Sequence, residues 1–119
     1  MRMRTMIPLL PLLLAAPTAG AHAFLDHANP RVGNAVQTAP REVTLWFTQD
    51  LEPAFSTVEV HDASGARVDS GKASVGPGDR KVMHVSLKSL AAGTYKVSWR
   101  VLSVDTHTTE GTFTFRVGN

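Results

Sequence analysis

Cysteine is absent from the 119 residues of the chain. No disulfide can therefore support the fold, and no thiolate can serve as a metal ligand, a nucleophile or a redox group. A chain of this kind must be stabilised by its hydrophobic core alone. If it is exported, this composition is more typical of a bacterial periplasmic domain than of a disulfide-stabilised extracellular one.

Long hydrophobic runs are absent as well. The longest apolar stretch, residues 6–16, is shorter than the roughly 20 residues that a membrane-spanning helix needs, and two prolines interrupt it. Two arginines precede the stretch and small residues follow it, which is typical of a cleaved secretory signal peptide. We therefore expect export to the periplasm and no membrane span after cleavage.

The cleavage site decides which residue begins the mature protein. Residues 19–21 form a small-x-small motif, and cleavage after it removes a signal peptide of residues 1–21. His22 then becomes the first residue of a single domain over residues 22–119. Residues 21–23 fit the same pattern, and cleavage there removes the histidine. We favour the first motif because its central glycine has the helix-breaking character that is usual before a cleavage site.

A surplus of charge of one sign is missing from this predicted domain. The whole chain has 12 basic and 10 acidic residues and a pI of about 9.4. Arg2 and Arg4 leave with the signal peptide, so that ten residues of each sign remain. Since no basic stripe is left, we expect neither nucleic acid nor an anionic membrane as a partner.

Helical periodicity is also lacking, and short alternating segments take its place. Apolar and polar residues alternate over residues 43–48, 58–61, 83–87, 95–101 and 113–117, and residues 23–28 are a further candidate strand. Turn residues separate these segments at intervals of about 10 to 15 residues. The pattern predicts an all-β fold, an Ig-like antiparallel β-sandwich of about seven strands.

Tyr95 and residues 70–80 need an interpretation beyond the alternating strand pattern. Tyr95 follows a Leu-Ala-Ala-Gly-Thr segment and is either a tyrosine corner, bonded back to the preceding loop, or an ordinary core residue. Residues 70–80, rich in glycine and serine, predict a loop.

Strand alternation sorts two of the five histidines and leaves a third open. His61 and His84 lie opposite the apolar residues of their segments, so we expect both to face solvent. His27 shares the predicted face of Ala23 and Leu25 and lies near His22 in sequence. It is therefore either a neighbouring residue or an additional ligand of any metal site that His22 forms.

The predicted N-terminus is a candidate chelate. A free α-amine and an imidazole on His22 can bind one metal ion together. Asp105 and His107 lie two residues apart and can turn their side chains to the same side of an extended segment. Asp-x-His by itself is a weak motif, but together with an N-terminal histidine it predicts one metal site made of His22, Asp105 and His107.

These ligands favour Cu(II). An amine nitrogen, two imidazole nitrogens and a carboxylate oxygen form the tetragonal environment that Cu(II) prefers, and copper leads the divalent affinity series. Cu(I) prefers thioether or thiolate ligands, and Met83 is the one methionine left after residues 1–21 are removed. We expect a single Cu(II) ion and no dedicated Cu(I) site.

Several motifs resemble the CopC family of periplasmic copper-binding, copper-resistance proteins. They are His22-Ala23-x-Leu25, the spacing of Pro30 and Pro40, Leu45-x-Phe47, Leu51-Glu52-Pro53, Ala92-Gly93-Thr94-Tyr95-x-Val97-x-Trp99 and Val104-Asp105-x-His107 followed by Gly111-x-Phe113-x-Phe115. The resemblance covers residues 22–119. It implies a Greek-key β-sandwich or barrel that binds Cu(II) through the amine and side chain of His22, with Asp105 and His107 completing the site.

The resemblance also implies a function and partners. It implies a copper carrier or buffer in copper resistance or uptake, with an inner-membrane copper transporter or a periplasmic multicopper oxidase as the partner protein. We expect a monomer. Two departures from the family pattern stand out: the methionine-rich loop of members with a Cu(I) site is missing, and Thr106 stands where glycine is usual.

Two other functions compete with this one. Lytic polysaccharide monooxygenases also begin with a copper-binding histidine on a β-sandwich, but they keep a coordination position open for oxygen chemistry. Asp105 would occupy that position here, and the small domain leaves little area for a polymer-binding face, so we expect no enzyme. A metal-free structural or adhesive sandwich is the other alternative, and a mature N-terminus at Phe24 would favour it.

Overall fold

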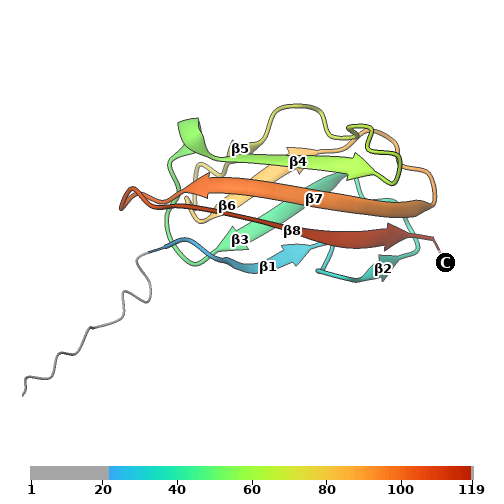
Figure 1. Ribbon diagram of the computed structural model, residues 1–119, viewed down its shortest axis with the longest axis horizontal. Helices are drawn as coiled ribbons and strands as arrows, with labels where there is room; N and C mark the ends of the chain where they lie inside the picture. Colours follow the sequence, from blue (N-terminus) through green and yellow to red (C-terminus); the bar gives the residue numbers. More distant parts are fainter. Residues whose placement is uncertain (1–21, 119) are drawn as a thin grey trace, which may run out of the picture.

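The computed structural model describes residues 22–118, which form two β-sheets packed face to face (Figure 1). The predicted signal peptide lies outside these described residues, and its cleavage site stays a prediction. The elements are β1 Leu25–Asn29, β2 Ala35–Val36, β3 Glu42–Phe47, the 3-10 helix η1 Pro53–Phe55, β4 Thr57–Asp62, β5 Ser74–Val75, β6 Val82–Ser86, β7 Gly93–Leu102 and β8 Thr108–Val117.

The two sheets have the strand orders β1-β3-β6-β5 and β2-β8-β7-β4. The predicted β-sandwich is confirmed, and each segment with alternating residues overlaps one of its longer strands. The described residues contain eight strands instead of about seven, because β2 and β5 have two residues each and are too short to show a period. One pairing departs from the antiparallel prediction, since β2 runs parallel to β8.

Alternate side chains of the long strands meet between the sheets and form the core. The fully buried members include Leu45 in β3, Val60 in β4, Met83 in β6 and Phe115 in β8. Since side chains of a strand point to opposite faces in turn, the polar residues between these positions face outward. Within residues 22–118 no helix is long and apolar enough to cross a membrane.

Tyr95 satisfies both interpretations that its sequence context left open. Its hydroxyl donates a hydrogen bond to the carbonyl of Ala91 at 2.5 Å, which is the bond of a tyrosine corner. Its ring is buried and stacks on Phe115, with the ring centroids 5.5 Å apart. The residue therefore pins the loop before β7 to the core.

Residues 66–70, within the connection from β4 to β5, join the two sheets along one edge. The N–H of Val68 donates to the carbonyl of Val60 at 2.8 Å, and the carbonyl of Val68 accepts from Lys88 at 2.8 Å. Backbone bridges pair Arg67 with His61 of β4 and Asp69 with Leu87, directly after β6. This segment closes the sandwich into a partly barrel-like shape.

Asp69 anchors this segment from inside the fold. Its carboxylate has no exposed area and accepts hydrogen bonds from the N–H groups of Val60 and Gly71, both at 2.7 Å, and from Nε of Arg67 at 3.0 Å. Burial alone raises the pKa of Asp69, but the hydrogen bonds from Arg67, Val60 and Gly71 outweigh it and hold the pKa below its ordinary value. The folded state therefore stabilises the ionised form of Asp69.

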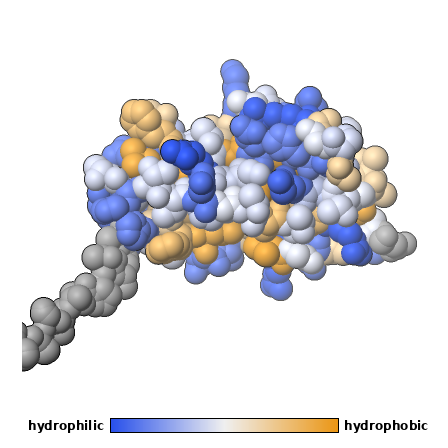
Figure 2. Space-filling model, in the orientation of Figure 1, coloured by the Kyte–Doolittle hydropathy of each residue, from blue (hydrophilic) through white to orange (hydrophobic). Residues whose placement is uncertain are grey.

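The outer surface is mostly polar. Figure 2 shows blue and white residues over most of the visible face, with apolar residues gathered in separate small patches. Among residues 22–118, the large exposed apolar side chains are Phe24, Val32, Phe55 and Val104. Phe24 directly precedes β1, Phe55 lies in η1, and Val104 lies in the β7–β8 connection. These three side chains therefore lie at the end of the sandwich where the chain enters β1 (Figure 1).

Candidate metal centre

The β7–β8 hairpin places Asp105 and His107 at one end of the sandwich (Figure 1). The N–H of Ser103 donates to the carbonyl of His107 at 3.0 Å, and the N–H of Thr106 donates to the carbonyl of Ser103 at 2.9 Å. Thr106 has a φ of 72°, a left-handed conformation that favours glycine. The turn is therefore tight, and its two predicted ligands flank the residue with the unusual backbone.

The carboxylate of Asp105 is held by two neighbours. Its Oδ1 accepts a short hydrogen bond from the hydroxyl of Ser103 and lies 3.4 Å from Nδ1 of His107. The bond from Ser103 and the contact with His107, against a desolvation effect that raises it, hold the pKa of Asp105 below its ordinary value. The group is an anion near neutral pH, which is the form in which a carboxylate binds a metal cation.

The segment before β1 brings His22 to the same place. The imidazole rings of His22 and His107 have centroids 4.3 Å apart and planes inclined at 81°. The next residue, Ala23, is fully buried in the core, so the chain is anchored in the sandwich directly after His22. Two histidines separated by most of the described chain therefore meet edge to face.

The Nδ1 atom of His22 is the observation that tests whether a metal fits here. Among residues 22–118 it is the one buried side-chain nitrogen or oxygen without a hydrogen-bond partner. Burying a polar atom without a partner is costly, and such atoms are rare in folded proteins. A metal ion bound at this nitrogen would satisfy it, and the adjacent His107 offers a second nitrogen of the same kind.

The predicted ligands meet in pairs rather than as a finished triad. Within the described part of the chain, no three His, Asp or Glu side chains lie close enough together to hold a metal ion. The pairs are His22 with His107 and His107 with Asp105, whose carboxylate is turned toward Ser103. The remaining predicted ligand, the α-amine, requires the predicted cleavage, because in the full chain the nitrogen of His22 belongs to the peptide bond with Ala21.

Two of the other histidines lie on the outer faces, as predicted. Nε2 of His61 lies 3.6 Å from Glu59, and Nδ1 of His84 lies 3.6 Å from Glu42 and 3.3 Å from the hydroxyl of Thr44. Both are only partly exposed, because a carboxylate on their own sheet face lies beside each ring. Neither is near the hairpin tip.

His27 corrects one expectation. The pairing of β1 with β3 shifts register between Leu25 and His27, so that the alternation from Ala23 is interrupted. His27 consequently faces outward, where its ring stacks on Trp46 with centroids 4.3 Å apart and its Nδ1 lies 2.7 Å from Asp26. It does not share the buried face of Ala23, because a bulge adds one residue to that face pattern.

Sequence reasoning missed the close packing of Trp99 on Gly111. The two residues are paired across β7 and β8, and a Cβ on Gly111 would lie 2.6 Å from Cζ2 of the indole. The same indole meets Phe47 edge to face at 5.2 Å. A glycine inside a strand pattern is the signal that could have indicated this close approach.

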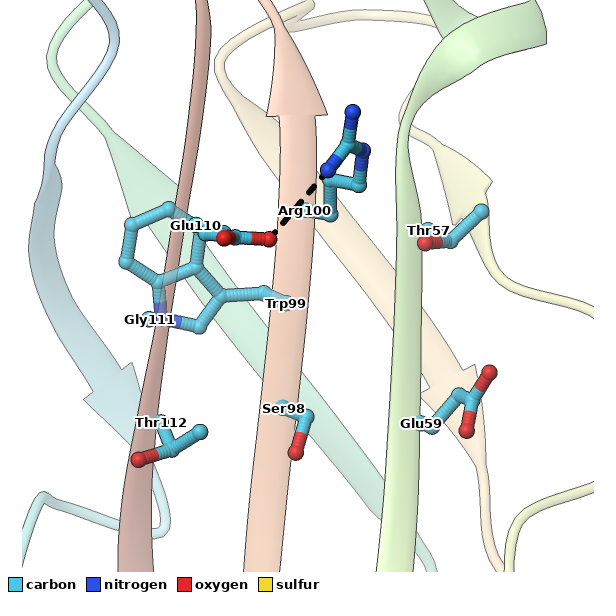
Figure 3. Close-up of a pocket in the computed structure, with 8 residues that line it drawn as sticks. All are labelled: Thr57, Glu59, Ser98, Trp99, Arg100, Glu110, Gly111 and Thr112. Carbon is cyan, nitrogen blue, oxygen red and sulfur yellow. Dashed lines mark hydrogen bonds and ion pairs between the residues drawn. The ribbon is translucent and has the colours of Figure 1, made fainter.

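The outer side of the same strands carries a shallow hollow that lacks the predicted ligands. Figure 3 shows it between β4, β7 and β8, where Arg100 and Glu110 form an ion pair at 3.3 Å. Its other lining residues are Thr57, Glu59, Ser98, Trp99, Gly111 and Thr112. The hairpin end therefore stays the predicted metal site.

Comparison with known proteins supports the resemblance found in the motifs. The CopC domain family matches residues 25–118. The chain belongs to the CopC family. Protein YobA of Escherichia coli (strain K12) is 35% identical over 116 residues, which are 97% of this chain and 94% of that protein. Copper resistance protein C of Pseudomonas syringae pv. tomato is 36% identical over 111 residues, covering 88% and 87%.

A solved structure supports the same CopC fold. The crystal structure of PcoC, a methionine-rich copper resistance protein from Escherichia coli, matches with a TM-score of 0.72 and 34% identity, over 81% of this chain and 98% of that chain. This CopC-family chain differs in its methionines. The one methionine within residues 22–118, Met83, is fully buried in the core and cannot act as a surface thioether ligand.

Proposed function

We propose that the processed chain is a periplasmic Cu(II)-binding protein that carries or buffers copper in copper resistance or uptake. The observation that carries this proposal is the buried, unpartnered Nδ1 of His22 beside the ring of His107. Membership of the CopC family and relatives named copper resistance protein C support copper as the cargo.

The ligands divide between the two ends of the chain. The α-amine and imidazole of His22 bind as a chelate once cleavage after Ala21 has freed the amine. The imidazole of His107 adds a third nitrogen. The Asp105 side chain is 40% exposed at the hairpin tip, so its carboxylate can turn from Ser103 toward the ion.

The donor chemistry supports the oxidised ion. Nitrogen and carboxylate ligands suit Cu(II), whereas Cu(I) prefers sulfur. The buried position of Met83 leaves no thioether near the hairpin in the described residues. The side chain of His107 is 51% exposed, so the bound ion stays accessible to a donor or acceptor.

This arrangement supports a carrier and not an enzyme. Three nitrogens and one oxygen fill the equatorial plane of Cu(II), which leaves no equatorial position for a substrate or for oxygen. We further propose that the protein acts as a monomer and exchanges copper with an inner-membrane copper transporter or a periplasmic multicopper oxidase.

Copper titration of the secreted protein tests this function. N-terminal sequencing first verifies that the sample begins at His22. We expect one tightly bound Cu(II) per chain and a type 2 electron paramagnetic resonance signal with nitrogen hyperfine structure. A matched protein with Gly-Ser fused before His22 should fold equally well and bind copper much more weakly. Two tight sites, or equal affinity in the fused protein, would contradict the proposal.

A further inference from the structure

The backbone that leads into β1 is tied to both sheets. Residues at a chain terminus are usually poorly ordered unless bonds or packing hold them. Here, residues 22–24 are bonded on one side by Thr48, directly after β3, and on the other by Thr109, in β8. Because β3 and β8 belong to different sheets, the segment is hydrogen-bonded to both sheets of the sandwich.

Thr48 makes three hydrogen bonds to this segment. Its N–H donates to the carbonyl of Phe24 at 2.9 Å, which extends the pairing of β1 with β3. Its hydroxyl accepts from the N–H of Phe24 at 3.0 Å and lies 3.4 Å from the carbonyl of His22, to which it donates. A hydroxyl that accepts from one residue and donates to another fixes the peptide units on both sides of Ala23.

Thr109 holds the residue between them. Its hydroxyl donates to the carbonyl of Ala23 at 2.5 Å, and the Ala23 methyl is fully buried in the core. The backbone and side chain of Ala23 are thus both fixed. The direction in which His22 leaves the sandwich follows from this, and it sets the imidazole edge against His107.

We propose that Thr48 and Thr109 are positioning residues of the metal centre: they orient the N-terminal amine and imidazole of His22 toward His107 before copper arrives. The inference rests on the proposed function, because the amine exists only in the processed chain. Neither threonine touches the ion. Each acts through the backbone of residues 22–24.

The physical effect is preorganisation. A free N-terminal residue samples many conformations, and binding a metal through it would remove that freedom. Fixing the backbone of one residue corresponds to about a tenfold change in an equilibrium constant. When folding has already ordered the segment, copper binding no longer carries that entropic loss, and affinity rises accordingly.

Valine and serine substitutions separate the hydroxyl from the shape of the side chain. Thr48→Val and Thr109→Val keep the β-branched form and remove the hydrogen bonds of the hydroxyls, whereas Thr48→Ser and Thr109→Ser keep the hydroxyl. Thr112→Val is the matched control, an exposed threonine on the outer face of the same β8 strand. Thermal unfolding of the copper-free proteins verifies that each variant folds.

We expect each valine variant of the processed protein to bind Cu(II) about tenfold more weakly in competition titrations. The serine variants and Thr112→Val should bind like the wild type. In the copper-free protein, the amide of Phe24 should exchange its hydrogen faster in Thr48→Val than in Thr48→Ser. This readout needs no metal and reports the order of the segment directly.

The outcomes separate the two proposals. If the wild type binds copper and both valine variants bind it equally well, the positioning role is wrong and the proposed function stands. If neither serine variant restores the affinity that valine loses, the hydroxyls are not the cause and the positioning role is again wrong. If the processed wild type binds no Cu(II), the proposed function itself fails and this role fails with it.

Discussion

At the scale of single residues, the contact between the rings of His22 and His107 depends on hydrogen bonds that neither ring makes. The first ring is placed by a backbone that Thr48 and Thr109 hold, and the second by the turn that Ser103 closes. Substitution of such outer contacts typically lowers metal affinity by about 10- to 100-fold.

His107→Ala should weaken Cu(II) binding by more than about a hundredfold, since loss of a ligand exceeds the effect typical of outer contacts. The matched control is His84→Ala, which removes a partly exposed imidazole beside Glu42 on the outer face of the β1-β3-β6-β5 sheet. It should leave the affinity unchanged. Competition titration checks both variants, and equal losses would show that the sorting of the histidines by strand face is wrong.

Thr106→Gly should stabilise the copper-free protein. A β-branched residue at a φ of 72° is strained, and glycine adopts this conformation without a Cβ clash. We expect a gain of about 1 kcal/mol, which corresponds to a rise in Tm of about 4–8 °C for a domain of this size. Calorimetry measures it. A lower Tm would mean that the threonine hydroxyl, bonded to the Asp105 carbonyl, contributes more than the strain costs.

At the scale of elements, the β7–β8 hairpin and residues 66–70 have different tasks. The hairpin carries two of the predicted ligands at its tip, while residues 66–70 join β4 to the end of β6 and depend on the buried Asp69. Stability and metal binding should therefore respond to different substitutions.

The stabilising effect of Asp69 should depend on pH. Because the folded state holds its pKa below that of the unfolded chain, about 3.9, the ionised group stabilises the fold above about pH 4. The effect is lost as the pH falls through the lower, folded-state value. The free energy of unfolding, measured in urea, should thus be larger for the wild type than for Asp69→Asn at pH 7. This difference should shrink below about pH 4. A difference that does not change with pH would contradict a stabilising role of the ionised Asp69.

Gly111→Ala should destabilise the hairpin base. The added methyl would lie 2.6 Å from the Trp99 indole, so the ring or β8 must shift. Overpacking of this kind typically costs about 1–3 kcal/mol. Gly78→Ala is the control, because a Cβ there meets no atom within 4 Å. Urea unfolding should show a clear loss for the first variant and little for the second.

At the scale of the whole molecule, the core does not depend on the metal. Side chains from both sheets fill it, and the predicted ligands lie outside it at one end. Removing copper with a chelator should leave the domain folded and lower its Tm. A ligand at a hundred times its Kd stabilises the native state by about 2.7 kcal/mol. The protein fused before His22 should show almost no such shift, and an equal shift would mean that copper binds elsewhere.

The sequence alone was sufficient for the class of fold. The strands around Leu45, Val60, Val97 and Phe115 were predictable because side-chain alternation is a local property with a period of two residues. The same local rule placed His61 and His84 on outer faces, and the motifs around Asp105 indicated the CopC family. It failed at His27, where a bulge interrupts the alternation, since a shift in pairing depends on the partner strand.

Only the tertiary structure decided how distant residues meet. His22 lies against His107, Thr48 and Thr109 hold residues 22–24 from two sheets, and β2 pairs in parallel with β8. All three follow from packing between strands far apart in sequence. No local pattern carries such information. The sequence determined which side chains are available as ligands, and the packing of the two sheets determined which of them face one another.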